Sequence, residues 1–222
     1  MPQSFRSRCA RISRRAAVII GGTLLILGIA LGVWISGLAE PPSVDQLWER
    51  LMTQTLVPIG VAIAQVMNWL GGGWFAVYAV PLGGAALLIT SRRPWGALYL
   101  VTASAVSALV VQVLKKTMDR PRQEDIMVVA DYGSFPSGHV ANAITLAVVL
   151  WVLFPRVWVA ISMTAWVVLM AWSRTYLHAH WLSDTIGGML IGTGVALVVA
   201  AAFGPTRVRR RRLAVAKSPP IG

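Results

Sequence analysis

The sequence predicts an all-α, polytopic membrane protein with six transmembrane helices, plus an interfacial helix on the outer face between the first and second spans. Of its 222 residues, 56% are hydrophobic and only 13% are charged, whereas an ordinary soluble domain carries roughly 25% charged residues. Uncharged apolar runs recur along the chain, and about 20 apolar residues in a helix suffice to cross a bilayer. The basic residues also divide unevenly between the two sides of the predicted topology, as the positive-inside rule requires.

The first predicted span is the uncharged run 16–39. As a helix it would measure about 36 Å, which exceeds a hydrocarbon core of about 30 Å. Five further apolar runs follow at 74–90, 95–114, 139–154, 157–173 and 186–203. Several of these runs are short, so each needs a few flanking residues to span. Together the runs define a membrane domain over residues 16–203, flanked by basic arms at 1–15 and 204–222.

The apolar run 56–70 is better explained as an interfacial or re-entrant helix than as a span. It contains Pro58, Gln65 and Asn68 and continues into three consecutive glycines. As a seventh span it would move Arg92 and Arg93 to the outer side, against the positive-inside rule. We therefore expect this helix to stay at the outer face.

The predicted topology places both termini in the cytoplasm and the helices in the plasma membrane. Fourteen of the twenty Lys and Arg residues then lie on the inner side, and all eight acidic residues lie outside. Topology anchors that also attract anionic lipid headgroups therefore account for the net charge of +12. Nucleic-acid binding is not expected, because no aromatic or motif pattern accompanies the basic arms.

Ionisable residues gather at those ends of the apolar runs that reach the outer face, where the active site is therefore expected. Charged groups at the edge of membrane segments indicate a functional site by default. Three separate segments contribute, and chance would have scattered their charges between both faces. The candidate residues are Lys115, Arg122, Ser137, Gly138, His139, Arg174, His180 and Asp184.

The chemistry of this set indicates a phosphate site with two histidines. His180 and Asp184 stand at i and i+4, so on a helix they can touch, and a carboxylate on Nδ1 leaves Nε2 free as a nucleophile. Ser137 and Gly138 suit a helix N-terminus that binds an anion. His139 beside that terminus can protonate a leaving oxygen.

The cations Lys115, Arg122 and Arg174 match the charge on the oxygens of a phosphoryl group. Lys116 and Arg120 fit topology or lipid-headgroup contacts better and are second-rank candidates. His178, two residues before His180, is expected to point elsewhere. No metal is predicted, since His178, His180 and Asp184 do not form a convincing zinc site.

The motifs Lys115-x6-Arg122, Pro136-Ser137-Gly138-His139 and Ser173-Arg174-x5-His180-x3-Asp184 resemble the three-part signature of the type-2 phosphatidic acid phosphatase superfamily. The resemblance covers roughly residues 97–194. One departure is Gln123, because the family has proline after the second basic residue. The pair Arg120-Pro121 sits two residues earlier, but Lys115 with Arg122 preserves the family spacing.

The resemblance implies an enzyme that hydrolyses the phosphate or pyrophosphate monoester of a lipid without metal or cofactor. His180 would form a phosphohistidine, Asp184 would orient it, and His139 would act as acid and base. Lys115, Arg122, Arg174 and the backbone of Ser137 and Gly138 would hold the phosphate. Undecaprenyl or another polyprenyl pyrophosphate is the favoured substrate, ahead of phosphatidic acid and phosphatidylglycerophosphate.

Two alternatives stay open at this point. A phosphotransferase would use the same residues but pass the phosphoryl group to an acceptor other than water. A transport or lipid-binding protein would instead need charged residues along a path across the bilayer, whereas here they gather on one face. The expected partners are the lipid substrate and membrane lipids, and nothing in the sequence indicates an oligomeric state.

Overall fold

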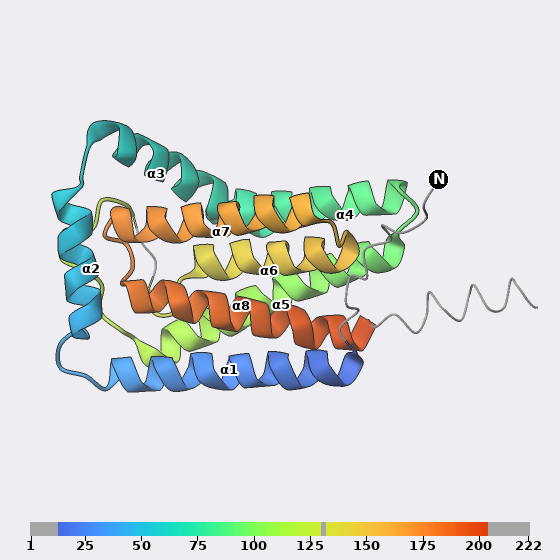
Figure 1. Cartoon of the computed structure of the whole chain (residues 1–222), viewed down its shortest axis with the longest axis horizontal. Helices are drawn as coiled ribbons and strands as arrows, with labels where there is room; N and C mark the ends of the chain where they lie inside the picture. Colours follow the sequence, from blue (N-terminus) through green and yellow to red (C-terminus); the bar gives the residue numbers. More distant parts are fainter. Residues whose placement is uncertain (1–12, 130–131, 204–222) are drawn as a thin grey trace, which may run out of the picture.

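The computed structural model describes residues 13–129 and 132–203, and within these ranges the protein is helical, with no strand (Figure 1). The helices are α1 (Arg14–Ser36), α2 (Ser43–Gln54), α3 (Pro58–Gly71), the π-helix η1 (Phe75–Ala79), α4 (Val80–Thr90), α5 (Pro94–Met118), α6 (Gly138–Leu153), α7 (Val157–Tyr176) and α8 (Leu182–Phe203). Six of them match the predicted runs, and α3 matches the run 56–70.

The long helices run side by side, and α2 crosses one end of the bundle at a steep angle (Figure 1). At that end lie the start of α3, the segment between α5 and α6, and the turn between α7 and α8. The opposite end holds the start of α1 and the turns from α4 to α5 and from α6 to α7. All the connections that carry predicted site residues therefore meet at the α2 end.

Helix α8 forms the centre of the bundle and packs against α1, α5 and α6. Small residues allow these close contacts: a Cβ at Gly21 would lie 2.9 Å from the backbone oxygen of Gly194, and one at Gly192 would lie 2.4 Å from that of Ala141. Neither position has room for a methyl group, because real contacts are longer. The glycines thus let α1 and α6 approach α8 backbone to backbone.

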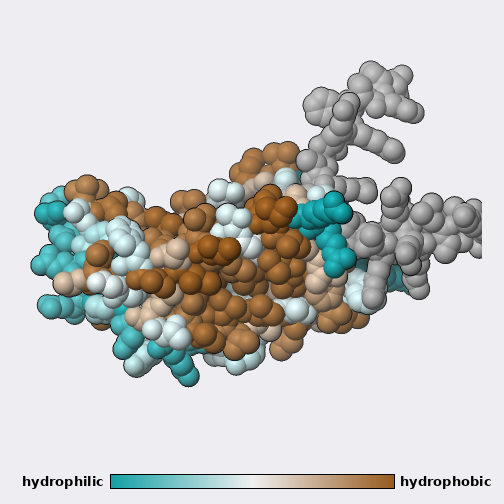
Figure 2. Space-filling model, turned by 90° about the horizontal axis from the view of Figure 1, so that it is seen from below, coloured by the Kyte–Doolittle hydropathy of each residue, from teal (hydrophilic) through white to brown (hydrophobic). Residues whose placement is uncertain are grey.

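The outer surface of the bundle is apolar in its middle. Figure 2 shows a hydrophobic band on one face, with hydrophilic residues gathered at the α2 end and a second hydrophilic patch toward the other end. Among the described helices, four are each long and apolar enough to cross a membrane: α1, α5, α7 and α8. This arrangement is that of a membrane protein, since a soluble protein does not expose so large an apolar surface.

Helix α3 and the following η1 and α4 form a pair that is long and apolar enough to span when taken together, but the pair is bent by 48°. The break falls at Gly72 and Gly73, and Gly73 has a φ of +59°, a conformation that glycine adopts without strain. The sequence predicted a separate interfacial or re-entrant helix here. In the structure it is continuous with the next predicted span apart from this break.

Length and composition support up to five spans among the described residues, against the six predicted. The difference is α6, which has 16 residues and would measure only about 24 Å, less than a hydrocarbon core of about 30 Å. The helix matches the predicted run 139–154 to within one residue, but the flanking residues that the run needed in order to span are not helical. Six spans and two basic arms remain predictions, and the arms lie almost entirely outside the described residues.

Candidate active site

A pocket of about 620 Å³ lies at the α2 end of the bundle and extends inward along α5. Six of the eight predicted site residues line it: Lys115, Arg122, Gly138, His139, Arg174 and His180. The other two, Ser137 and Asp184, are fully buried behind it. Residues from α5, the segment after α5, α6, α7 and the turn before α8 are thus brought to one cavity.

His180 lies in the turn before α8 and Asp184 in the first turn of that helix, and the two side chains face each other. The Nδ1 atom of His180 stands 3.6 Å from Oδ2 of Asp184, and both side chains are buried. On its other side, Nη1 of Arg122 lies 3.4 Å from Nε2 of His180. Because a guanidinium only donates, Nε2 is the accepting nitrogen and the ring proton belongs on Nδ1, facing the carboxylate. Nε2 is then the ring nitrogen that carries the lone pair.

The pKa of His180 is held well below its ordinary value of 6.5. Burial is the largest cause, and the positive charges of Lys115, Arg122 and Arg174 and the ring of His139 lower the pKa further. The imidazole is therefore neutral at pH 7. A neutral ring is what nucleophilic attack requires.

The three cations are held by backbone and amide oxygens. Lys115 Nζ and Arg122 Nη2 both donate to the carbonyl of Gly133, at 2.9 and 2.7 Å. Gly133 has a φ of +58°, and a Cβ there would lie 2.8 Å from the carbonyl oxygen of Lys115. Only glycine fits this turn, which therefore fixes two cations at one point of the pocket wall.

Helix α3 contributes a site residue that sequence reasoning missed. The side-chain oxygen of Asn68 accepts a hydrogen bond from Arg174 Nη1 at 2.6 Å, and its backbone oxygen lies 3.0 Å from Nε2 of His139. Asn68 thus contacts two candidate residues from different helices. The only sequence signal was an amide within an otherwise apolar run, directly before the three glycines.

The Pro136-Ser137-Gly138-His139 segment starts α6, as predicted, but the hydrogen bonding of Ser137 differs from the prediction. Ser137 is the N-cap residue, yet its side chain makes no capping bond, and its backbone N–H donates to the carbonyl of Asp184 at 3.0 Å. That N–H already has a partner within the protein. Gly138 lines the pocket, and a Cβ there would meet only ordinary contacts, the nearest at 3.5 Å.

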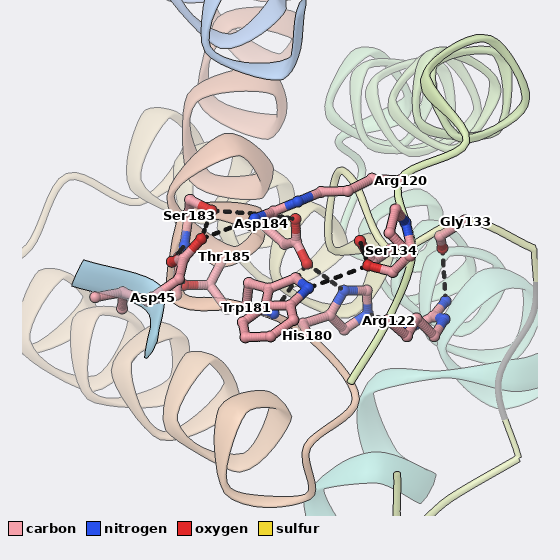
Figure 3. A network of polar contacts seen from close by, with 12 residues as sticks. Asp45, Arg120, Arg122, Gly133, Ser134, His180, Trp181, Ser183, Asp184 and Thr185 are labelled. Atoms are coloured by element: carbon pink, nitrogen blue, oxygen red, sulfur yellow. Dashed lines mark hydrogen bonds and ion pairs between the residues drawn. The ribbon is translucent and has the colours of Figure 1, made fainter. Parts of the chain in front are cut away.

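Arg120 does not line the pocket, and it does not face lipid as the sequence suggested. Its side chain is buried, and its guanidinium forms ion pairs with Asp184 at 2.5 Å and with Asp45 at 2.8 Å (Figure 3). Of the two arginines that follow α5, Arg122 is therefore the one that reaches the pocket. The spacing preferred from the sequence selects the same residue.

His178 points away from the pocket, as expected. It is buried, and Nδ1 lies 2.5 Å from Oδ2 of Asp125, whose side chain is 59% exposed. Together with Glu49 these residues form the one group in the described ranges whose carboxylate and imidazole ligand atoms are close enough to share a metal ion. Burial raises the pKa of Glu49, and the nearby Asp125 carboxylate adds to this rise. The group lies outside the pocket, so the predicted site holds no such set.

Comparison with known proteins shows a match to the family model of the PAP2 superfamily over residues 96–207. Among curated proteins, a lipid A 1-phosphatase of Rhizobium etli is 30% identical over 142 residues, which are 54% of this chain and 59% of that protein. An undecaprenyl-diphosphatase of Sulfolobus acidocaldarius is 30% identical over 122 residues, 51% of this chain and 58% of that protein. The chain spans less than two thirds of these relatives.

Two solved structures share the fold. A transmembrane PAP2-type phosphatidylglycerolphosphate phosphatase from Bacillus subtilis superposes with a TM-score of 0.70 and 24% identity, covering 81% of this chain and 93% of that one. Aquifex aeolicus LpxE superposes with a TM-score of 0.64 and 23% identity, covering 73% of this chain and 98% of that one. The helix arrangement is therefore common to all three.

Proposed function

The chain belongs to the PAP2 superfamily, and from this premise we propose that it is a membrane lipid phosphatase, independent of metal ions, that works through a phosphohistidine on His180. The observation that carries the proposal is the single pocket lined by Lys115, Arg122, His139, Arg174 and His180. Three cations and two imidazoles around one cavity fit a tetrahedral dianion and its displacement.

In the first step, Nε2 of His180 attacks phosphorus, a P–N bond forms, and the P–O bond to the lipid breaks. His139 gives its proton to the departing lipid oxygen. Oδ2 of Asp184, 3.6 Å from Nδ1 of His180, faces the Nδ1 proton and stabilises the positive charge of the phosphorylated ring. Lys115, Arg122 and Arg174 balance the charge on the non-bridging oxygens throughout.

In the second step, water attacks phosphorus and the P–N bond breaks. His139, now neutral, takes a proton from this water and so returns to its starting state. Inorganic phosphate then leaves, and His180 regains the neutral form. Gly138 fits phosphate binding at this point of the pocket. Protein packing does not require a glycine there, but a glycine lets phosphate oxygens approach the backbone closely.

The shape of the pocket supports a substrate with a lipid tail. Its lining follows α5 from Lys115 to Ser104, which corresponds to about 16 Å of helix. Tyr78 and Leu109 line the pocket and are also 62% and 65% exposed on the bundle surface. A phosphate at the Lys115 end therefore leaves room for the chain to pass toward the side of the bundle, into lipid.

We favour a polyprenyl pyrophosphate, such as undecaprenyl pyrophosphate, as the substrate. The described lining contains three cations and no carboxylate, a charge balance that suits the additional negative charge of a pyrophosphate. Phosphatidic acid and phosphatidylglycerophosphate follow as candidates. Lipid A joins them because the name of one relative specifies it.

We also propose that the pocket opens to the extracytoplasmic side of the plasma membrane. The turns at the far end of the bundle carry Arg92, Arg93 and Arg156, and the positive-inside rule assigns that end to the cytoplasm. Both termini would lie there, with α2 and the pocket outside. Hydrolysis would then act on lipids of the outer leaflet.

The test is phosphate release by the protein purified in detergent, with a panel of polyprenyl pyrophosphate, phosphatidic acid, phosphatidylglycerophosphate and lipid A. We expect release that persists in EDTA, is inhibited by vanadate and is lost in His180→Ala. Activity of His180→Ala equal to that of the wild type would refute the nucleophile. Transfer to an added alcohol in place of phosphate release would favour the phosphotransferase alternative.

A further inference from the structure

On the side away from His180, Asp184 is held by a buried charge network. This network reaches α2, a helix outside the family match. Oδ2 of Asp184 faces His180 and accepts a hydrogen bond from the backbone N–H of Trp181 at 2.9 Å. Oδ1, on the other side, accepts from Nη1 of Arg120 at 2.5 Å. The guanidinium therefore fixes the rotation of the carboxylate, and with it the direction from which Oδ2 meets the imidazole.

Arg120 is in turn fixed by Asp45 of α2, which is 1% exposed. Nη2 of Arg120 donates to Oδ2 of Asp45 at 2.8 Å, while Nη1 also donates to the hydroxyl of Ser183 at 2.8 Å. The flat guanidinium thus bridges two carboxylates with separate nitrogen atoms, a geometry that lysine does not reproduce.

Asp45 also binds the N-terminus of α8, the helix that carries Asp184. Its Oδ1 accepts from the backbone N–H of Ser183 at 2.8 Å, and its Oδ2 accepts from the Ser183 hydroxyl at 2.5 Å. A carboxylate at this place satisfies a backbone N–H of the first helical turn and interacts favourably with the helix dipole. Asp45 therefore acts as a capping residue supplied by another helix.

From these contacts we infer that Arg120 and Asp45 are positioning residues for the nucleophile His180, acting through Asp184. Neither touches the pocket, and Figure 3 shows both on the far side of Asp184 from His180. The inference rests on the proposed function, since it assumes that His180 attacks phosphorus. It also gives α2, which precedes the family match at residue 96, a defined role in the site.

The network explains why two carboxylates and one guanidinium can be buried together. Each oxygen of Asp45 and of Asp184 has a donor within the protein. Removing the charge of Arg120 would leave two buried carboxylates without a counter-ion, which is strongly destabilising. Asp45→Asn is the milder change: it keeps an oxygen for the Ser183 N–H but removes the charge that holds Arg120.

The test measures kcat, KM and two inhibition constants for Asp45→Asn and Arg120→Lys on a lipid phosphate in detergent. Vanadate mimics the five-coordinate phosphoryl group and depends on the placement of His180, whereas inorganic phosphate depends on the cations. Misplacement of a reacting group by about 1 Å costs on the order of 100-fold. We expect kcat to fall by about 10- to 100-fold, vanadate inhibition to weaken in parallel, and KM and phosphate inhibition to stay unchanged.

Matched controls make equivalent changes at exposed positions nearby. Glu40→Gln, just before α2, removes one negative charge, as Asp45→Asn does, and Arg50→Lys on α2 keeps the charge but replaces the guanidinium, as Arg120→Lys does. Both should behave as the wild type. Equal weakening of vanadate and phosphate inhibition in the Asp45 and Arg120 variants would show general damage to the pocket and overturn the inference, as would wild-type kcat in both.

His180→Ala, measured alongside, separates this inference from the proposed function. An active His180→Ala enzyme would end the proposed mechanism itself. An inactive His180→Ala enzyme combined with wild-type behaviour of Asp45→Asn and Arg120→Lys would overturn only the positioning role.

Discussion

Gly72 lies directly against His139: a Cβ in its place would stand 2.3 Å from Nε2 of the imidazole. Gly72 is the C-cap residue of α3. The backbone at the end of this helix therefore forms the surface against which His139 packs. The bend between α3 and α4 thus has a direct consequence for the site.

Gly72→Ala is therefore expected to displace His139 and to lower kcat by about 10- to 100-fold, since general acid catalysis contributes about that much or more. Steady-state phosphate release from a lipid phosphate measures the effect. Gly83→Ala on α4 is the matched control, because a Cβ there would meet no atom within 4 Å. Equal activity of the two variants would show that the contact with His139 has no catalytic importance.

The acidic limb of the pH profile should move when a cation near His180 is removed. Positive charge lowers the pKa of His180, so Arg174→Gln raises that pKa and shifts the acidic limb of kcat/KM to higher pH. The phosphate group of the substrate also titrates near pH 6, but its pKa is the same for both enzymes. A limb that stays in place, or moves to lower pH, would contradict the assignment of His180 as the group that must be neutral.

His178 provides a test of which histidine matters. Its ring bonds to Asp125 and lies outside the pocket, and its φ of +51° is a conformation that asparagine also tolerates. His178→Asn keeps a donor near Asp125, so we expect kcat within about threefold of the wild type. Loss of activity comparable to that of His180→Ala would place His178 in the reaction.

Metal removal should have no effect on turnover, although Glu49, Asp125 and His178 could share an ion. This group lies outside the pocket, so dialysis against EDTA should leave kcat and KM unchanged. Phosphate release before and after dialysis, with Mg²⁺ or Zn²⁺ added back to one portion, measures this. A loss of activity that added metal restores would contradict metal-independent hydrolysis.

A substitution in the close contact between α6 and α8 should lower the stability of the protein. At Gly192 a Cβ would lie 2.4 Å from the backbone oxygen of Ala141, so Gly192→Ala forces the helices apart at a cost of about 1–3 kcal/mol. Thermal unfolding in detergent should show a lower midpoint. Gly22→Ala on α1 is the control, because no atom lies within 4 Å of its Cβ; an equal midpoint for Gly192→Ala would contradict the packing described for this contact.

The sidedness of the pocket can be tested with the single cysteine of the chain, Cys9. It lies in the basic arm that the positive-inside rule assigns to the cytoplasm. A membrane-impermeant maleimide should label Glu40→Cys in the Cys9→Ser background in intact cells, and should leave Cys9 of the wild type unlabelled until the cells are opened. The reverse pattern would place the pocket in the cytoplasm.

Much of the fold could be predicted from the sequence, because apolar runs and charge asymmetry report on each segment by itself. The glycines at 71–73 likewise marked the end of α3. The run 139–154 also matched α6 to within one residue. Hydropathy did not show whether flanking residues would lengthen this helix, because that depends on how the preceding segment packs around Phe135 and Gly133.

The candidate site was predictable where a motif fixed the spacing, as for His180 with Asp184. Asp45, Asn68 and the role of Arg120 were not, because their partners are distant in the sequence and no periodic pattern links them. Arg120 looked like a lipid-facing charge, and only the fold shows that two carboxylates enclose it. The backbone N–H of Ser137 was expected to bind an anion and instead binds Asp184.

The most direct measurement is to trap the enzyme during turnover with a substrate that carries a ³²P-labelled phosphoryl group. Rapid quenching in alkali, which preserves a P–N bond, followed by peptide mapping should find the label on the peptide that contains His180, and none in His180→Ala. Label on a peptide without His180, or its persistence in His180→Ala, would contradict the account. So would release of phosphate at the wild-type rate with no labelled protein.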